Sequence, residues 1–425
     1  MRSGTYTFPA TERIVYGRPA ADALSAEVAR LGAQRPFLIV SGTMNRTTDE
    51  IARVREALGG RYAGLYDRIP AHTPRDAVLE ATEAARAARA DLIVTFGGGS
   101  VTDAGKMVRF CLQNHVTDMD GFDRLRATTK DDGSHARPKI AAPAVHQIAI
   151  PTTLSAGEFT AGAGCTDPRY KVKQSYSHPL LVPRVVIFDP APTLHTPLWV
   201  WLSTGMRAVD HAVEGLCSLK SDPQSDALFA QGLQSLSQAL PRVKRAPGDL
   251  EARLDCQIAI WQSMAGRQGG AQMGASHAIG RVLGGTCGVA HGHTSCVMLP
   301  HVLRYNHSAN ASRQQLVAAA MGHPGQPAAD LVAALVAELG QPGRLADVNV
   351  TRDQFPLIAL PHDEGASHPQ QSACYHASRA GAGNPGGRRL TSSSHVGAVR
   401  GSADSRARVT VAILSPDLQL KGCTC

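Results

Sequence analysis

Over the first 190 residues, apolar positions follow two periods that alternate along the chain. Stretches with the helical period are predicted at residues 20–31, 49–58 and 75–88. Short, nearly continuous apolar runs, which are typical of buried strands, lie at residues 36–40, 62–66, 91–96, 145–150 and 185–188. Strands that alternate with helices in this way predict a parallel, doubly wound sheet. The pattern therefore favours an α/β domain over residues 1–190.

The pattern changes beyond Asp189 and Pro190. Long segments with the helical period and little strand signal follow, at residues 199–220, 224–240 and 249–267. We therefore place a boundary near residue 190 and predict an all-α domain over residues 191–362. Residues 363–425 are rich in Gly, Ser, Ala and Arg and lack a sustained period, which is the composition of a disordered segment.

Composition narrows the class of protein. The chain has 425 residues, 43% of them hydrophobic, so two domains with sizeable cores are expected. The net charge of +8 comes from scattered Lys and Arg, and only 5% of residues are aromatic. Both features argue against nucleic-acid binding and favour a small anionic partner. Without a membrane-length apolar run, a signal core or zinc-ribbon cysteine spacing, we expect a cytoplasmic enzyme.

A glycine-rich loop follows the predicted strand 91–96. Residues 97–100, Gly-Gly-Gly-Ser, stand before a predicted helix, where backbone amides and the helix N-terminus favour a phosphate group. The spacing differs from GxGxxG, but the position at a strand end predicts a pyrophosphate site. Gly42 follows strand 36–40, where dinucleotide folds often carry a ribose-binding acid. With no carboxylate there and Arg46 nearby, the 2′-phosphate of NADP would not be repelled.

A second polar loop follows the predicted strand 145–150. Residues 151–158 carry small hydroxyl side chains, which elsewhere serve as ordinary turn and cap groups. Ligands of parallel sheets bind where neighbouring strand ends line a crevice. We therefore expect this loop and residues 97–100 to face one ligand.

Residues 274–306 concentrate basic side chains within an apolar, glycine-punctuated segment. They are His277, Arg281, His291, His293 and His301. Arg281 lies one helical turn after His277 and so on the same face, and glycines 284, 285 and 288 are predicted to break the helix. The chain would then return with His291 and His293 on a second segment, so that two facing segments bring imidazoles and a guanidinium to one cavity. A single histidine is more often an ordinary core or surface group, but this cluster predicts a site.

Four segments together resemble the iron-containing (group III) alcohol dehydrogenase family. They are FGGGSVTDAGK, PTTLSAGEFT, STGMRAVDHAVE and residues 274–306. The likeness extends from about residue 5 to about residue 360 and implies a cleft for NAD(H) or NADP(H) and substrate between an α/β domain and a helical domain. The residues that would bind the cofactor are Gly97, Gly98, Gly99, Ser100, Asp103, Thr152, Thr153 and Lys173.

The metal site of this family uses one aspartate and three histidines. The matching positions here are Arg207, His211, His277 and His291. Arginine has no lone pair to offer a metal and keeps its charge, so Arg207 would repel a divalent cation. Asp210 points about 100° away from His211 on a helix and is a poor replacement ligand. We therefore expect no tightly held metal.

Three features resemble the maleylacetate reductase branch of the family: the replaced aspartate and the segments LGGTCGVAHGHTSCVMLPHVL and LVPRVVIFDP. Arg281 stands at the position of another family histidine, and it and Arg207 would orient a carboxylated substrate. A protonated His211 or His277 would stabilise the developing alkoxide or donate a proton to it. An ion pair of Arg207 with Glu214 is the structural alternative.

The resulting hypothesis is a metal-independent NAD(P)H-dependent reductase of maleylacetate or a similar carboxylated enone or keto acid, acting in aromatic catabolism. One alternative is a metal-dependent alcohol dehydrogenase in which His211, His277 and His291 hold the ion. Another is a cofactor-binding pseudoenzyme.

Both ends of the chain carry a separate prediction. Residues 5–16 read as a strand that would pair across a two-fold axis in a homodimer, as is common in the family. Codons for the start of the tail, read one nucleotide later, are compatible with a peptide resembling the family C-terminus. We therefore predict either a frameshift near residues 360–362 or a genuine disordered extension, which an intact mass would distinguish.

Overall fold

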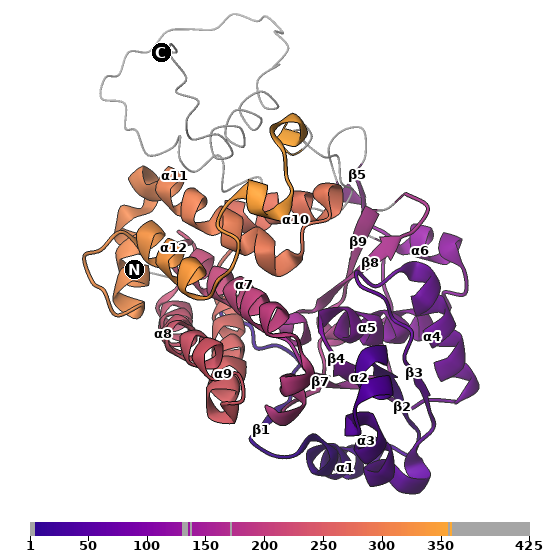
Figure 1. Cartoon of the computed structure of the whole chain (residues 1–425). Helices are drawn as coiled ribbons and strands as arrows, with labels where there is room; N and C mark the ends of the chain where they lie inside the picture. The colour runs from indigo at the N-terminus through magenta and orange to yellow at the C-terminus, as the bar shows by residue number, and fades with distance from the viewer. Residues whose placement is uncertain (1–4, 130–134, 137, 171, 356–357, 359–425) are drawn as a thin grey trace, which may run out of the picture.

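The computed structural model describes residues 5–129, 135–136, 138–170, 172–355 and 358. Figure 1 shows an α/β part in indigo to purple on one side and a helical part in magenta to orange on the other. The predicted boundary near residue 190 falls between the last sheet strand and the first long helix. The predictions for the tail lie outside the described residues.

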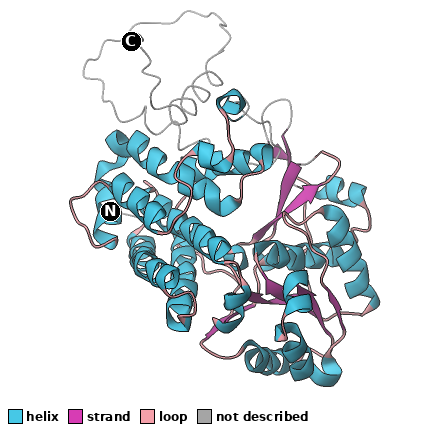
Figure 2. Cartoon of the chain, in the orientation of Figure 1, coloured by secondary structure: helices cyan, strands magenta, loops and turns pink. Residues whose placement is uncertain are grey.

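A six-stranded parallel sheet forms the centre of the α/β part (Figure 2). In spatial order its strands are β1 (Arg13–Tyr16), β10 (Val185–Phe188), β7 (His146–Pro151), β4 (Leu92–Gly97), β2 (Pro36–Val40) and β3 (Gly64–Tyr66). The residues of β2, β4 and β10 are all buried, which explains their continuous apolar sequence. This confirms the predicted doubly wound sheet.

Helices cover both faces of this sheet. They are α1 (Ala20–Leu31), α2 (Gly42–Thr47), α3 (Glu50–Leu58), α4 (Arg75–Ala87), α5 (Gly99–Gln113) and α6 (Met119–Leu125). Alternate residues of β2 face opposite layers: Leu38 packs with α1 and α3, and Ile39 with α4 and α5. Two antiparallel pairs stand apart from the sheet, β8 (Gly162–Asp167) with β9 (Val172–Ser177), and β5 (Thr128–Thr129) with β6 (His135–Ala136).

The helical part is arranged around α7. Its helices are α7 (Leu198–Cys217), α8 (Pro223–Arg245), α9 (Leu250–Gly266), α10 (Ala275–Cys287), α11 (His291–Ala320, bent at Asn310) and α12 (Ala328–Glu338). Short 3-10 turns are η1 (Gly59–Arg61), η2 (Gly157–Phe159), η3 (Pro179–Leu181), η4 (Ala191–His195), η5 (Arg267–Gly269), η6 (Leu345–Val348) and η7 (Arg352–Gln354). Because α7 packs against α8, α9, α10 and α11, its polar residues Asp210, His211 and Glu214 are buried as well.

The structure corrects two local predictions. Of residues 5–16, the strand includes Arg13–Tyr16 alone, and it pairs in parallel with β10 at the sheet edge. Gly284 and Gly285 lie inside α10, so the helix breaks at Gly288 alone, which adopts φ of 67°. A glycine can take this left-handed conformation without cost, whereas the two earlier glycines keep helical hydrogen bonds. Among the described helices, none combines the length and the apolar character needed to span a membrane.

Candidate active site

The loops after β4 and β7 meet at the carboxyl edge of the sheet. Gly98 is the N-cap of α5 and offers no side-chain cap, so the first amides of this helix remain available to an anion. A Cβ on Gly98 would lie 3.2 Å from Thr153 Cγ2, and one on Gly99 would lie 2.7 Å from Ser155 Oγ. The two loops therefore pack so closely that Gly99 has no room for a side chain.

A cavity of about 410 Å³ opens beside these loops. Four of the predicted cofactor residues line it: Gly42, Gly98, Gly99 and Ser100. A Cβ on Gly42 would lie 2.3 Å from the carbonyl oxygen of Asp67 and 2.8 Å from Arg46 Nη1, so both groups occupy the space where a side chain would lie. Asp67, from the loop after β3, lines the same cavity and accepts a hydrogen bond from Asn45 at 2.9 Å.

Asp67 corrects the interpretation of the Gly42 position. The sequence argument found no carboxylate where β2 ends, but the neighbouring strand β3 supplies one to the same cavity. Arg68 follows it and lines the cavity too. Sequence reasoning missed both residues, because only the strand order places the end of β3 beside the end of β2. The cavity thus contains a carboxylate for a ribose hydroxyl and guanidiniums for a phosphate.

The remaining cofactor candidates form two groups. Asp103 accepts a hydrogen bond from Gly164 N at 3.2 Å and lies 3.9 Å from Lys173 Nζ, so α5 and the β8–β9 hairpin bring this predicted pair together. Thr152 joins the two parts of the chain, since its backbone N–H donates to Gly97 O and its carbonyl accepts from Thr196. Thr153 faces the glycine loop. All predicted cofactor residues thus lie at one edge of the sheet.

Arg207 lies within a buried polar network of α7 and α11. Its Nη1 donates to Ser295 Oγ at 3.1 Å and lies 3.6 Å from Asp210 Oδ2, while its side chain is 16% exposed. Asp210 also accepts hydrogen bonds from Ser276 and Ser295. The structure therefore corrects the proposed partner of Arg207: the carboxylate beside it is Asp210, one helical turn away, and not Glu214.

Glu214 instead holds His277 and the start of α10. One carboxylate oxygen lies 2.7 Å from His277 Nδ1, and the carboxylate also accepts from the backbone N–H groups of Gly274 and Ser276. Asp210 Oδ2 lies 3.4 Å from the same Nδ1. With two carboxylates facing it, Nδ1 carries a proton. Nε2 has no hydrogen-bond partner among the described residues and is the nitrogen left for chemistry.

His211 and His291 are both held neutral. The ring of His211 lies 4.6 Å from that of His277, and burial, then the charges of His277 and Arg207, lower its pKa well below the usual value. Of the two histidines that the sequence left open as the protonated group, His211 is therefore the less favourable, because burial disfavours the charged form. His291 is reachable by solvent, yet burial, then Lys173 and Arg207, lower its pKa to about 3.

The sequence cluster of residues 274–306 divides into two in space. His277 and His291 face the α7 network, whereas His293 packs against the ring of Trp199 at 5.4 Å. Arg267, which no motif indicated, joins the site instead: burial, then Arg281 and Arg207, lower its pKa to about 10. Three guanidiniums therefore influence one another here, which is a costly arrangement that an anion would relieve.

The donor set does not fit the divalent metal of the resembled family. Arg207 stands at the position of the aspartate ligand. Asp210, Glu214 and His277 do place ligand atoms within 4.8 Å of one another. However, their facing atoms already bond to serine hydroxyls, backbone amides and each other. Asp210 Oδ1, His211 Nδ1 and His277 Nε2 have no hydrogen-bond partner among the described residues, but the guanidinium of Arg207 beside Asp210 argues against a divalent cation here.

Family models match nearly the whole described chain. The model described as iron-containing alcohol dehydrogenase matches residues 11–190, and that of the C-terminal part of the Fe-containing alcohol dehydrogenase family matches residues 201–371. Dehydrogenase ALT3 of Alternaria alternata is 34% identical over 77% of this chain and 92% of its own. Maleylacetate reductase 1 of Cupriavidus pinatubonensis is 30% identical over 81% of this chain and 87% of its own.

Solved structures agree with these matches. Maleylacetate reductase from Agrobacterium tumefaciens superimposes with a TM-score of 0.72 at 26% identity, covering 98% of this chain and 99% of its own. The fold is also that of sulfoacetaldehyde reductase from Bifidobacterium kashiwanohense in complex with NAD+, with a TM-score of 0.77 at 22% identity over 98% and 100%. The comparisons confirm the predicted resemblance and the predicted fold class.

Proposed function

Because the chain belongs to the iron-containing alcohol dehydrogenase family, we propose that it is a metal-independent reductase of maleylacetate or a similar carboxylated enone or keto acid. It is an NAD(P)H-dependent oxidoreductase. The observation that carries the finer proposal is Arg207, which stands at the position of the family's aspartate ligand and is anchored by Ser295 and Asp210.

The charges of the site favour an anionic substrate. Arg207, Arg267 and Arg281 lie close enough to lower one another's affinity for protons. Guanidinium groups bind carboxylates through paired hydrogen bonds, so a substrate carboxylate would offset this repulsion. A small neutral alcohol offers no negative charge to these three guanidiniums. We infer that one carboxylate of the substrate binds between these side chains.

The residues at the sheet edge fit a nicotinamide dinucleotide. The amides at the start of α5 suit the pyrophosphate, and the cavity beside Gly42, Arg46 and Asp67 suits the adenosine ribose. When bound, the cofactor supplies the hydride. With both ring nitrogens protonated, His277 would donate the proton on Nε2 to the substrate, while Glu214 holds the ring through Nδ1–H.

Turnover on chelator-treated protein tests the proposal. Oxidation of NADH and of NADPH would be followed with maleylacetate, before and after adding Zn²⁺ or Fe²⁺. We expect turnover that survives chelation and does not rise with metal. Activity that appears only with metal would contradict the proposal and favour the metal-dependent alcohol dehydrogenase. Cofactor binding without turnover on any carboxylated carbonyl compound would favour the pseudoenzyme.

A further inference from the structure

The loop between β3 and α4 contains two consecutive residues in the left-handed region. His72 has φ of 66° and Thr73 has φ of 54°. This conformation is uncommon for residues with a side chain and most unfavourable for a β-branched residue such as threonine. Such strain persists only where the surrounding structure enforces it, and it concentrates at functional sites.

Hydrogen bonds from two sides enforce this turn. The backbone N–H of His72 donates to Ser100 Oγ at 3.1 Å, and Thr73 Oγ1 donates to the carbonyl of Ser100 at 3.1 Å. On the other side, Thr166 donates its hydroxyl to the carbonyl of His72 at 2.8 Å and its backbone N–H to that of Thr73 at 3.0 Å. The turn is thus attached to both the glycine-rich loop and strand β8.

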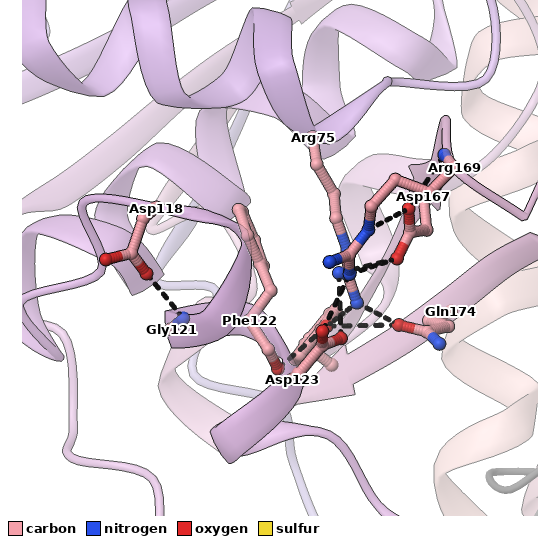
Figure 3. Close-up of polar contacts among 9 residues, drawn as sticks. Arg75, Asp118, Gly121, Phe122, Asp123, Asp167, Arg169 and Gln174 are labelled. Carbon is pink, nitrogen blue, oxygen red and sulfur yellow. Dashed lines mark hydrogen bonds and ion pairs between the residues drawn. The ribbon is translucent and has the colours of Figure 1, made fainter.

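A buried arginine then locks β8 and β9 to the start of α4. Arg75 has no exposed side-chain surface and donates to Asp167 at 2.8 Å, to Asp123 at 2.9 Å and to Gln174. Figure 3 shows Arg75 reaching from its helix into this group of acceptors. Thr166 and Lys173 lie opposite each other in the β8–β9 ladder. Arg75 bonds to the next residue of each strand, Asp167 and Gln174, and so fixes this pair.

This frame presents the imidazole of His72 to the helical part. The side chain is exposed, and its ring centre lies 6.0 Å from that of His291, edge to face. His291 is the first residue of α11 and one of the predicted catalytic residues. Both hydrogen bonds of His72 in the described structure use backbone atoms. The strain therefore orients a side chain that contributes little to holding the fold together.

We propose that His72 is a substrate-contacting residue, which donates a hydrogen bond to a carboxylate or carbonyl oxygen bound beside His291. The inference rests on the proposed function for the class of substrate. Partial burial, then the charge of Lys173, lower the pKa of His72, so the ring is neutral and has one N–H to donate. A substrate with two anionic groups would then be held between the guanidiniums and His72, beside Lys173.

The variant His72→Gly tests this role without adding strain, because glycine accepts the left-handed conformation. We expect kcat/KM for maleylacetate to fall about tenfold, mainly through KM, as for the loss of one hydrogen bond. The KM for NADPH or NADH and the unfolding temperature should not worsen. His115→Gly is the matched control, since His115 is also exposed and left-handed, with φ of 53°, at the far end of α5. It should leave all values unchanged.

A conservative variant and a binding assay separate the two proposals. His72→Asn keeps an N–H donor in a residue that tolerates this conformation, so it should recover part of the loss. Binding of maleate, a dicarboxylate probe, to the protein with bound NADPH would be measured for the wild type and His72→Gly. If the wild type does not turn over maleylacetate but His72→Gly still weakens the binding of maleate, the proposed substrate is refuted and the role of His72 stands. Equal maleate binding by both, or none by the wild type, overturns the role of His72.

Discussion

Two carboxylates belong to the buried network around His277. Arg207 lies beside Asp210, and Glu214 Oε2 lies 2.7 Å from His277 Nδ1. Removing one member of such a network leaves another buried and unpaired, which costs more than the pair contributes. This arrangement explains how α7 accommodates a buried guanidinium at the position of the family's aspartate ligand.

Arg207→Asp tests whether this one residue excludes a metal. The substitution restores the family's ligand type and removes the cation that repels a divalent ion, so we expect the variant to retain Zn²⁺. The wild type and Arg207→Met should retain none. Metal content after gel filtration would be measured for all three proteins. Stoichiometric metal in the wild type would contradict the argument.

Glu158 should make stability depend on pH. It is fully buried, and burial raises the pKa of its carboxyl from 4.5 to about 7, partly offset by Lys106. The unfolded chain therefore loses this proton at lower pH than the folded chain, so stability falls as pH rises between these values. The loss reaches about 3 kcal/mol.

The variant Glu158→Gln lacks this titration. Urea unfolding should give similar stabilities for both proteins near pH 4 and a more stable variant near pH 8. A difference between the two proteins that stays constant over this range would show that Glu158 titrates normally in the folded state.

At the scale of elements, α7 and the β8–β9 hairpin position the site. Helix α7 contributes Arg207, His211 and Glu214 within three turns, and its burial on all sides fixes their direction. The hairpin contributes Lys173 and rests on Arg75. One element thus orders the helical side of the site, and the other orders the side next to the sheet.

Arg75→Met should loosen the hairpin. The side chain is fully buried between Asp167 and Asp123, so its loss leaves these carboxylates with the partly exposed Arg169 as their remaining cation and costs about 3 kcal/mol of unfolding free energy. Arg169→Met is the matched control in the same cluster, because Arg169 is 36% exposed and should cost less than about 1 kcal/mol. Equal losses of unfolding free energy for the two variants in urea would mean that burial does not determine how much each arginine contributes to stability.

At the scale of the whole molecule, the edge of the sheet next to β1 bears on assembly. Strand β1 pairs with β10 on one side, and Phe8 and Tyr16 nearby are 83% and 54% exposed. Exposed aromatic side chains beside an edge strand favour association with another chain. We infer a homodimer formed through this N-terminal segment.

Substituting both aromatic residues should separate the dimer. We expect sedimentation equilibrium to give twice the chain mass for the wild type and the single mass for the double variant Phe8→Asp, Tyr16→Asp. Tyr305→Asp, at a residue that is 45% exposed on α11, serves as the control and should remain dimeric. A monomeric wild type would refute the inference.

The sequence by itself determined the elements and much of the site. Buried strands such as Pro36–Val40 and helices such as Ala20–Leu31 follow from local period, because burial on one or two faces selects the side chains in order along the chain. Gly97–Gly99 were found from their position at a strand end, whereas Arg207 was found through the resemblance to the family, as a departure from its aspartate ligand.

Only the tertiary structure decided which side chains meet. Asp67 joins the cavity of Gly42 because β3 lies beside β2, and His72 faces His291 because the two parts of the chain fold against each other. Arg207 pairs with Asp210 because Glu214 is already bonded to α10. These outcomes depend on strand order and on competition among partners far apart in sequence, which a local pattern does not encode.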